Sequence, residues 1–271
     1  DIAAINAKAI PGLSSSAFAE LTSSQLAALT TAQIAALLPA QISAASEGFF
    51  AGLTPAQVAV LGTGIIAGLK PEQIEAMTTA QVEALTPTQV RVMNSAQLAA
   101  LGPEELATFS TADIAAISNK AISGLTASAL AGLTTEQTVA LSRSALSGLT
   151  AEQVEALSTA QIGALTTTQI GGLTSAQIAA LELQDLQALT PAQITAIGGS
   201  ALKGLGTDLL AGLSSAQLAA LTTSAVASLT SVQVEALTSQ QIGLLSSSQV
   251  KALTSAQLGA LGSNVSALTP A

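Results

Sequence analysis

An eight-residue repeat constrains what this chain can fold into more than any other feature. Four consecutive octapeptides between Leu149 and Ala180 read LTAEQVEA, LSTAQIGA, LTTTQIGG and LTSAQIAA. With position 1 of the frame placed at Ile5, the register continues without insertion or deletion to Leu261, which gives 33 consecutive octads. A fixed short period overrides the usual relation between length and domain number. Residues 1–271 are therefore predicted to form a single continuous octapeptide-repeat solenoid.

Four independent features of the octad predict that a helix begins at position 3. Position 2 is Ser or Thr in 23 octads, and these residues cap the free amides of a helix start. Position 5 is Gln in 19 octads, which completes a capping box. Six of the eight prolines occupy position 3, where a helix tolerates proline best. Acidic residues gather at positions 3–5, where the helix dipole favours them: Glu47, Glu72, Glu104, Glu105, Asp113, Glu136, Glu152, Asp185 and Asp208.

A helix start every eight residues excludes one long helix, because eight residues rotate an α-helix by about 800° and the apolar positions would drift by about 80° per octad. The chain must break near positions 8 and 1, where position 8 is usually Ala or Gly. The predicted fold is all-α, a solenoid or superhelix of capped helices of about six residues, one per octad. A β-solenoid is the alternative. It is disfavoured because positions 1, 6 and 8 do not alternate with period two and Ala and Gln are poor strand residues.

The octads also carry a longer period. ISNKAISG at Ile117 is followed by LTASALAG, and IGGSALKG at Ile197 is followed by LGTDLLAG, 80 residues later. Ten octads therefore form a super-repeat. Two explanations fit this spacing: the solenoid returns to an equivalent orientation after ten octads, or the chain inherited a duplication.

Composition excludes several function classes. Net charge is −9 and the seven Lys and Arg are scattered, whereas nucleic-acid binding needs a concentrated basic patch. No apolar run approaches the length of about 20 residues needed for membrane insertion. The chain has no Cys and no His, which leaves Ser and Thr without an activating base. Glu104–Glu105 is the only adjacent acidic pair, and its place in a first helical turn explains it without catalysis. We expect no enzyme activity, no cofactor and no metal site.

The two ends of the sequence read as halves of one octad. Leu268–Ala271 (LTPA) followed by Asp1–Ala4 (DIAA) gives a complete octad, with Thr269 at the cap, Pro270 at the first helical position, Ala271 after it, Asp1 at the Gln position and Ile2 as the apolar residue that follows. Ile2, Ile5 and Leu268 would face water in an isolated solenoid without polar terminal repeats. The chain, which starts without Met, is interpreted as a mature product or a part of something longer. The expected subunit junction comprises Asp1, Ile2, Ile5, Leu268, Thr269, Pro270 and Ala271.

Tandem LTxxQ[IV]xAL octads, present here as LTSAQIAAL (173–181) and LTTAQIAAL (29–37), resemble tracts of very large bacterial surface or secreted proteins of adhesin type. The resemblance covers the whole chain. It implies an extracellular or cell-surface location in bacteria and a role as a fibre or stalk. Asp-rich glycine nonapeptides are absent, so the calcium binding of the repeat toxins is not expected.

Three functions remain open from the sequence. The leading hypothesis is a non-enzymatic extracellular structural protein that forms a filament of identical subunits joined head to tail, because a heterologous contact that does not close makes a filament. The alternative is a stalk or ligand-binding segment of a giant bacterial adhesin, with other surface components or glycans as partners. The third is ice or glycan binding through Thr arrays such as Thr30–Thr31 and Thr222–Thr223.

Overall fold

A computed structural model describes residues 1–42 and 47–268 of the chain. Within these ranges the protein consists of short α-helices and three 3-10 helices, and no residue there lies in a β-strand. The all-α prediction is confirmed, and the β-solenoid alternative is wrong for the described residues. The chain divides into two compact units, Asp1–Ala145 (unit 1) and Leu146–Ala271 (unit 2).

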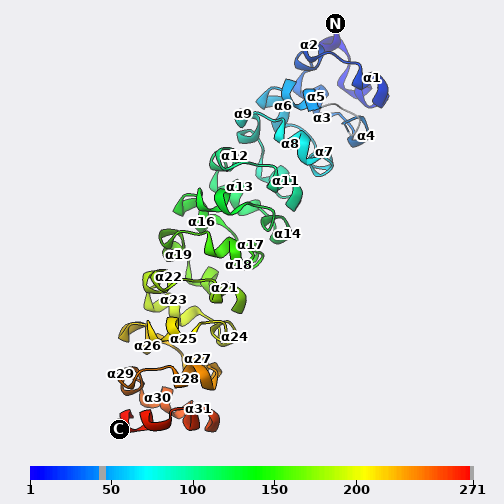
Figure 1. Cartoon of the computed structure of the whole chain (residues 1–271). Helices are drawn as coiled ribbons and strands as arrows, with labels where there is room; N and C mark the ends of the chain where they lie inside the picture. The colour runs from blue at the N-terminus through cyan, green and yellow to red at the C-terminus, as the bar shows by residue number, and fades with distance from the viewer. Residues whose placement is uncertain (43–46, 269–271) are drawn as a thin grey trace. The chain divides into compact units, whose positions relative to one another are not determined.

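Unit 1 begins with two 3-10 helices and continues with short α-helices (Figure 1). In chain order the elements are η1 (Ile2–Ala4), η2 (Ala7–Gly12), α1 (Ser15–Ala19), α2 (Ser23–Ala27), α3 (Thr31–Ala35), α4 (Pro39–Ile42), α5 (Glu47–Gly52), α6 (Pro55–Ala59), α7 (Thr63–Ala67), α8 (Pro71–Glu75), α9 (Thr79–Glu83), α10 (Pro87–Val90), α11 (Ser95–Ala99), α12 (Pro103–Ala107), α13 (Thr111–Ala116), α14 (Asn119–Ile122), α15 (Ala127–Ala131), α16 (Thr135–Ala140) and α17 (Arg143–Ser147), the last of which crosses the unit boundary.

Unit 2 continues with the same kind of helix and ends in a 3-10 helix. Its elements are α18 (Ala151–Glu155), α19 (Thr159–Ala164), α20 (Thr167–Ile170), α21 (Ser175–Ala179), α22 (Leu183–Ala188), α23 (Pro191–Ala196), α24 (Gly199–Leu202), α25 (Thr207–Ala211), α26 (Ser215–Ala220), α27 (Thr223–Ser228), α28 (Ser231–Glu235), α29 (Ser239–Gly243), α30 (Ser247–Lys251), α31 (Ser255–Ala260) and η3 (Gly262–Ala267).

Each octad folds as the capping pattern predicts, and α21 is representative. The Thr174 hydroxyl accepts a hydrogen bond from the Gln177 N–H (3.3 Å), and the Gln177 Oε1 accepts one from the Thr174 N–H (2.9 Å). Thr174 itself has extended backbone angles (φ −83°, ψ 167°), while the residue that ends the helix, Ala180, stays helical (φ −84°, ψ −8°). Extended residues at positions 1 and 2 therefore separate consecutive helices. Helices of four to six residues result.

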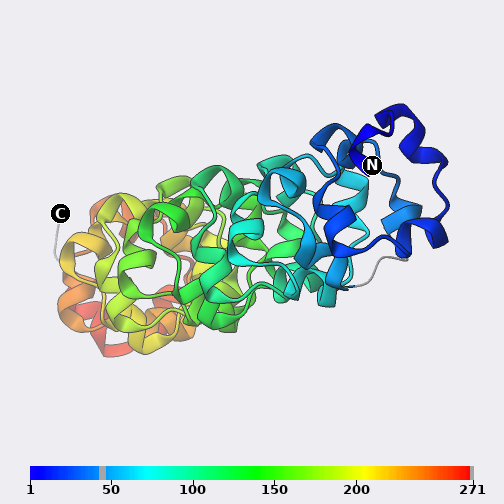
Figure 2. The same cartoon turned by 90° about the horizontal axis from the view of Figure 1, so that it is seen from above.

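Each helix stacks on the helix three octads away. In unit 2, α21 contacts α24 and α24 contacts α27, and the three follow one another down one side of the unit in Figure 1. Seen from above, the short helices of unit 2 lie around a ring (Figure 2). The first residues of α21 and α24 are Ser175 and Gly199, so one turn takes 199 − 175 = 24 residues. Because 80 is not a multiple of 24, members of the super-repeat do not stack on one another. The geometric explanation of the super-repeat is wrong, and inherited duplication remains.

The core of each unit is built from positions 1, 5 and 6. Positions 1 and 6 supply the large apolar side chains, such as Leu173 (6% exposed) and Ile178 (0%). Position 5 is also buried even where it is polar: Gln177 is 1% exposed. At Phe49 an aromatic ring occupies position 5 and contacts Phe18 edge-on, with ring centroids 5.1 Å apart. The sequence predicted the apolar positions but not the burial of position 5.

Glycine at position 8 allows close approach at two corresponding sites. A Cβ added to Gly124 would lie 1.8 Å from the Ser95 carbonyl oxygen, and one added to Gly204 would lie 1.9 Å from that of Ser175. Both glycines belong to octads with Ala at position 5, and they are 80 residues apart. The expectation that small residues at position 8 permit close packing is confirmed at these positions.

Candidate functional site

The feature that recurs through both units is a buried glutamine that joins two turns. In unit 2, the Gln217 Oε1 accepts a hydrogen bond from the Ser214 N–H at the start of its own helix (3.0 Å). The Gln217 Nε2 donates to the carbonyls of Leu186 (2.7 Å) and Leu189 (2.8 Å), 31 and 28 residues earlier. One amide therefore caps a helix start and also binds the carbonyls at a helix end one turn away.

The same contacts recur at fixed spacing. In unit 1, the Gln89 Nε2 donates to the carbonyls of Val58 (2.8 Å) and Leu61 (2.9 Å). We call this series the glutamine ladder. Its members with inter-turn bonds of this kind are Gln33, Gln41, Gln57, Gln81, Gln89, Gln97, Gln137, Gln177, Gln193, Gln217, Gln233, Gln241, Gln249 and Gln257.

The glutamine ladder explains why position 5 is Gln rather than Glu. Both side chains complete a capping box, and Glu would also suit the helix dipole. Only the amide carries the two N–H donors that the carbonyls of the neighbouring turn require. Sequence reasoning used the oxygen of this side chain and missed its nitrogen. The strong preference for Gln over Glu at position 5 was the available signal.

Acidic residues at position 5 reverse the requirement, because a carboxylate needs donors. In unit 2, the Asp185 Oδ1 accepts a hydrogen bond from the Thr159 hydroxyl (2.8 Å), 26 residues earlier. In unit 1, the Glu105 Oε1 accepts one from the Thr79 hydroxyl (3.3 Å) at the same spacing.

Asp113 lacks this partner. Its Oδ2 is bonded to the backbone N–H and hydroxyl of Ser110 (2.9 and 2.6 Å), but its Oδ1 is buried without a hydrogen bond among the described residues. The residue 26 positions earlier is Pro87, which has no hydroxyl. The missing donor in the neighbouring turn accounts for the unsatisfied oxygen.

Comparison with known families shows what this octad is. The sequence matches the ALTTAQ repeat in seven segments: 1–31, 74–111, 139–167, 148–183, 178–215, 210–247 and 233–263. These segments cover more than half of the chain. The chain belongs to the ALTTAQ repeat family. Its expected character as a tandem repeat protein is thereby confirmed at the level of the family. A comparison with curated proteins gave no match.

The hydroxyl groups of the ALTTAQ repeats are largely used inside the fold. At position 2, the Thr190 hydroxyl donates to the Gln193 Oε1 (2.7 Å) and accepts from the Gln193 N–H (3.3 Å). At position 3, the Thr159 hydroxyl bonds Asp185, and the Ser239 hydroxyl lies 2.9 Å from the Asn264 Oδ1. Position 3, which the octad pattern left unexplained, therefore also serves contacts between turns.

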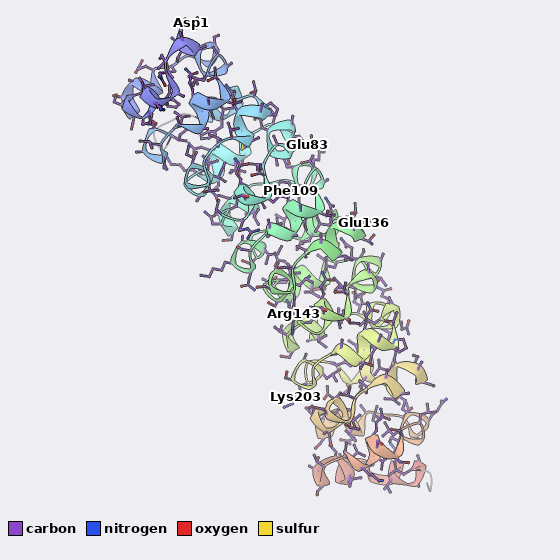
Figure 3. All side chains as sticks on the ribbon, turned by 180° about the vertical axis from the view of Figure 1, so that it is seen from behind. Asp1, Glu83, Phe109, Glu136, Arg143 and Lys203 are labelled. Atoms are coloured by element: carbon purple, nitrogen blue, oxygen red, sulfur yellow. The ribbon has the colours of Figure 1, made fainter. Side chains whose placement is uncertain are left out.

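The residues of the expected subunit junction lie at the two ends of the described chain. Asp1 is exposed, is labelled in Figure 3, and its Oδ1 accepts a hydrogen bond from the Ala3 N–H (3.2 Å) at the start of η1. Ile2 and Leu268 are half-buried, and Ile5 is 37% exposed. Thr269, Pro270 and Ala271 lie outside the described residues.

Charged groups of the ALTTAQ repeats lie on the surface. Glu83, Glu136, Arg143 and Lys203, labelled in Figure 3, are exposed. A hydrogen bond from the backbone N–H of Glu136, followed by one from the Thr134 side chain, lowers the pKa of the Glu136 carboxyl, as expected in a first helical turn. Within residues 1–42 and 47–268, no three His, Cys, Asp or Glu side chains gather in a way that could hold a metal ion. No helix in those ranges is long and apolar enough to cross a membrane.

Proposed function

We propose that this ALTTAQ repeat chain is a non-enzymatic extracellular structural protein that forms a fibre by head-to-tail continuation of its solenoid. The observation that carries the proposal is the glutamine ladder. Every member donates to carbonyls of an earlier turn, so each turn is completed by its neighbour. A structure of this kind grows along one axis and offers the same contacts to each added turn.

The apolar positions at the ends of the described chain support the same proposal. Inside the units, position 1 is well buried, as at Leu29 (4% exposed) and Leu221 (3%). The position-1 residue Ile5 is 37% exposed, and Leu268 is half-buried. Covering these side chains with another repeat would bury apolar surface, which favours association by about 25 cal/mol per Å².

Electron microscopy of the purified chain, with sedimentation velocity over a range of concentrations, tests this function. We expect filaments whose length increases with concentration. Deleting Asp1–Ala4 should abolish assembly while leaving the helical circular dichroism of the subunit unchanged. Discrete monomers of the full chain at every concentration would exclude the fibre.

A stalk or ligand-binding segment of a giant bacterial adhesin is the alternative, favoured by the resemblance of the LTSAQIAAL octads to tracts of such proteins. In that case the encoding gene continues in frame with further repeats, and sequencing it separates the two functions. Labelling of intact cells with an antibody tests the surface location. Ice binding is a weaker proposal because the hydroxyls at Thr159 and Thr190 are already bonded, and absence of thermal hysteresis would remove it.

A further inference from the structure

We infer that Gln25 forms the glutamine-ladder contact between two copies of this chain, with its amide donating to the carbonyls of Val265 and Leu268 of the preceding copy. This inference rests on the proposed head-to-tail assembly and gives that assembly its specific hydrogen bonds. It commits to a second copy of the chain as the partner, because the partner carbonyls are those of this repeat.

Half of the Gln25 side chain is already engaged. Its Oε1 accepts hydrogen bonds from the Thr22 N–H (2.8 Å) and hydroxyl (3.0 Å), as in the other capping boxes. Its Nε2 has no acceptor among the described residues, and the side chain is exposed. By contrast, the next Gln in the sequence, Gln33, donates to the carbonyls of Ile2 (2.9 Å) and Ile5 (2.7 Å) and is 1% exposed. Gln25 is thus a ladder member with its two donors available.

The spacing of the glutamine ladder identifies the missing acceptors. Each member donates to carbonyls 28 and 31 residues earlier, as Gln89 and Gln217 do. For Gln25 these positions are 25 − 28 = −3 and 25 − 31 = −6. If the last residue of the preceding copy is counted as 0, they are 271 − 3 = 268 and 271 − 6 = 265. The residues at these positions are Leu268 and Val265.

The acceptor pair already has the local conformation found inside the units. The Leu268 N–H donates to the Val265 carbonyl at 3.1 Å, and at the established acceptor pair of Gln57 the Leu29 N–H donates to the Leu26 carbonyl at the same distance. Leu268 has extended angles (φ −65°, ψ 115°), as does the acceptor Leu189 (φ −71°, ψ 131°). Because a carbonyl oxygen has two lone pairs, each can accept a further hydrogen bond.

Gln25 is also the only residue of the first three octads that can make this contact. The corresponding residues at position 5 of the two preceding octads are Ala9 and Ala17, which have no donor in their side chains. Replacing Gln25 therefore removes the side-chain amide contact of this turn without altering a glutamine-ladder bond inside the chain.

The test compares assembly of Gln25→Glu with that of the unaltered full-length chain. Glutamate keeps the oxygen that caps Thr22, so the subunit should fold normally, but it cannot donate to the two carbonyls when charged. We expect the concentration needed for filaments to rise about tenfold or more, which corresponds to about 1.4 kcal/mol. Gln240→Glu is the matched control, since it adds the same charge at an exposed position and should leave assembly unchanged. Gln25→Leu, which adds no charge, should weaken assembly as well.

Proximity gives a second measurement. The chain has no Cys, so a mixture of Gln25→Cys and Val265→Cys subunits can form only disulfides between the introduced thiols. We expect the mixed dimer to accumulate in oxidised filaments. Filaments that form equally well with Gln25→Glu and give no mixed disulfide would overturn this inference and leave the fibre intact. Failure of the unaltered chain to assemble would instead refute the proposed function.

Discussion

At the scale of the residue, position 5 must accept one hydrogen bond and donate two. Gln217 satisfies all three requirements inside a site that is 4% exposed. Unpaired polar groups in such a site cost about 1–3 kcal/mol each. The choice of side chain at position 5 is therefore a strong determinant of stability in every turn that contains a ladder member.

Replacing Gln217 with Glu should destabilise unit 2 by about 3 kcal/mol at neutral pH, because a buried carboxylate would face the carbonyls of Leu186 and Leu189. The loss should shrink near pH 4, where the carboxyl carries a proton that it can donate. Urea denaturation followed by circular dichroism measures the effect. Gln240→Glu serves as the control and should change stability by less than about 0.5 kcal/mol. Equal effects of the two changes would show that the inter-turn bonds contribute little.

The unsatisfied oxygen of Asp113 leads to the opposite expectation. Asp113→Gln supplies donors toward the carbonyls of Val82 and Leu85, which lie 31 and 28 residues earlier, and should stabilise unit 1 by about 1–3 kcal/mol. The matched change Asp185→Gln sacrifices the bond from Thr159 and should gain less. Thermal unfolding of the two variants decides the matter. A larger gain at Asp185 would contradict the assignment of Pro87 as the missing donor site.

At the scale of the element, helices of four to six residues do not form in isolation, since nucleation costs more than so few hydrogen bonds return. Caps at both ends and stacking on another turn stabilise them. Where position 5 is Ala, the stacked helices approach more closely, as α24 does to α21 at Gly204. Gly204 is thus fixed by the space between two helices, since no positive φ occurs there.

Gly204→Ala should therefore push α24 away from α21 and destabilise unit 2 by about 1–3 kcal/mol. Gly259 is the control: it lies within α31 and an added Cβ there meets no atom within 4 Å. Gly259→Ala should stabilise the chain by about 0.5–1 kcal/mol through reduced backbone entropy. Thermal unfolding measures both changes. A tolerated Gly204→Ala would mean that the two helices can separate at little cost.

At the scale of the whole molecule, the sequence predicted the helices better than their stacking. Caps, prolines and first-turn acids such as Pro191 and Glu136 are local signals that mark each helix start, and the structure has a helix at those positions. The 24-residue turn depends on contacts between octads that are nearly identical in sequence, so no local pattern distinguishes one stacking partner from another. The inter-turn role of Gln217 and the missing partner of Asp113 depend on that turn, so neither could be predicted. Only the Gly124 and Gly204 pair pointed to close stacking.

A repeat architecture of this kind predicts that damage stays local. Each turn contacts only its neighbours, so breaking one glutamine-ladder contact should raise the opening rate of the adjoining turns and leave distant turns protected. In Gln217→Glu, amide hydrogen exchange should accelerate in α22, α23 and α26, while α20 keeps its protection. Exchange measured by mass spectrometry on overlapping peptides resolves these helices. Uniform acceleration across residues 146–268 would show that unit 2 opens as one cooperative block, because in that case its stability cannot be assigned turn by turn.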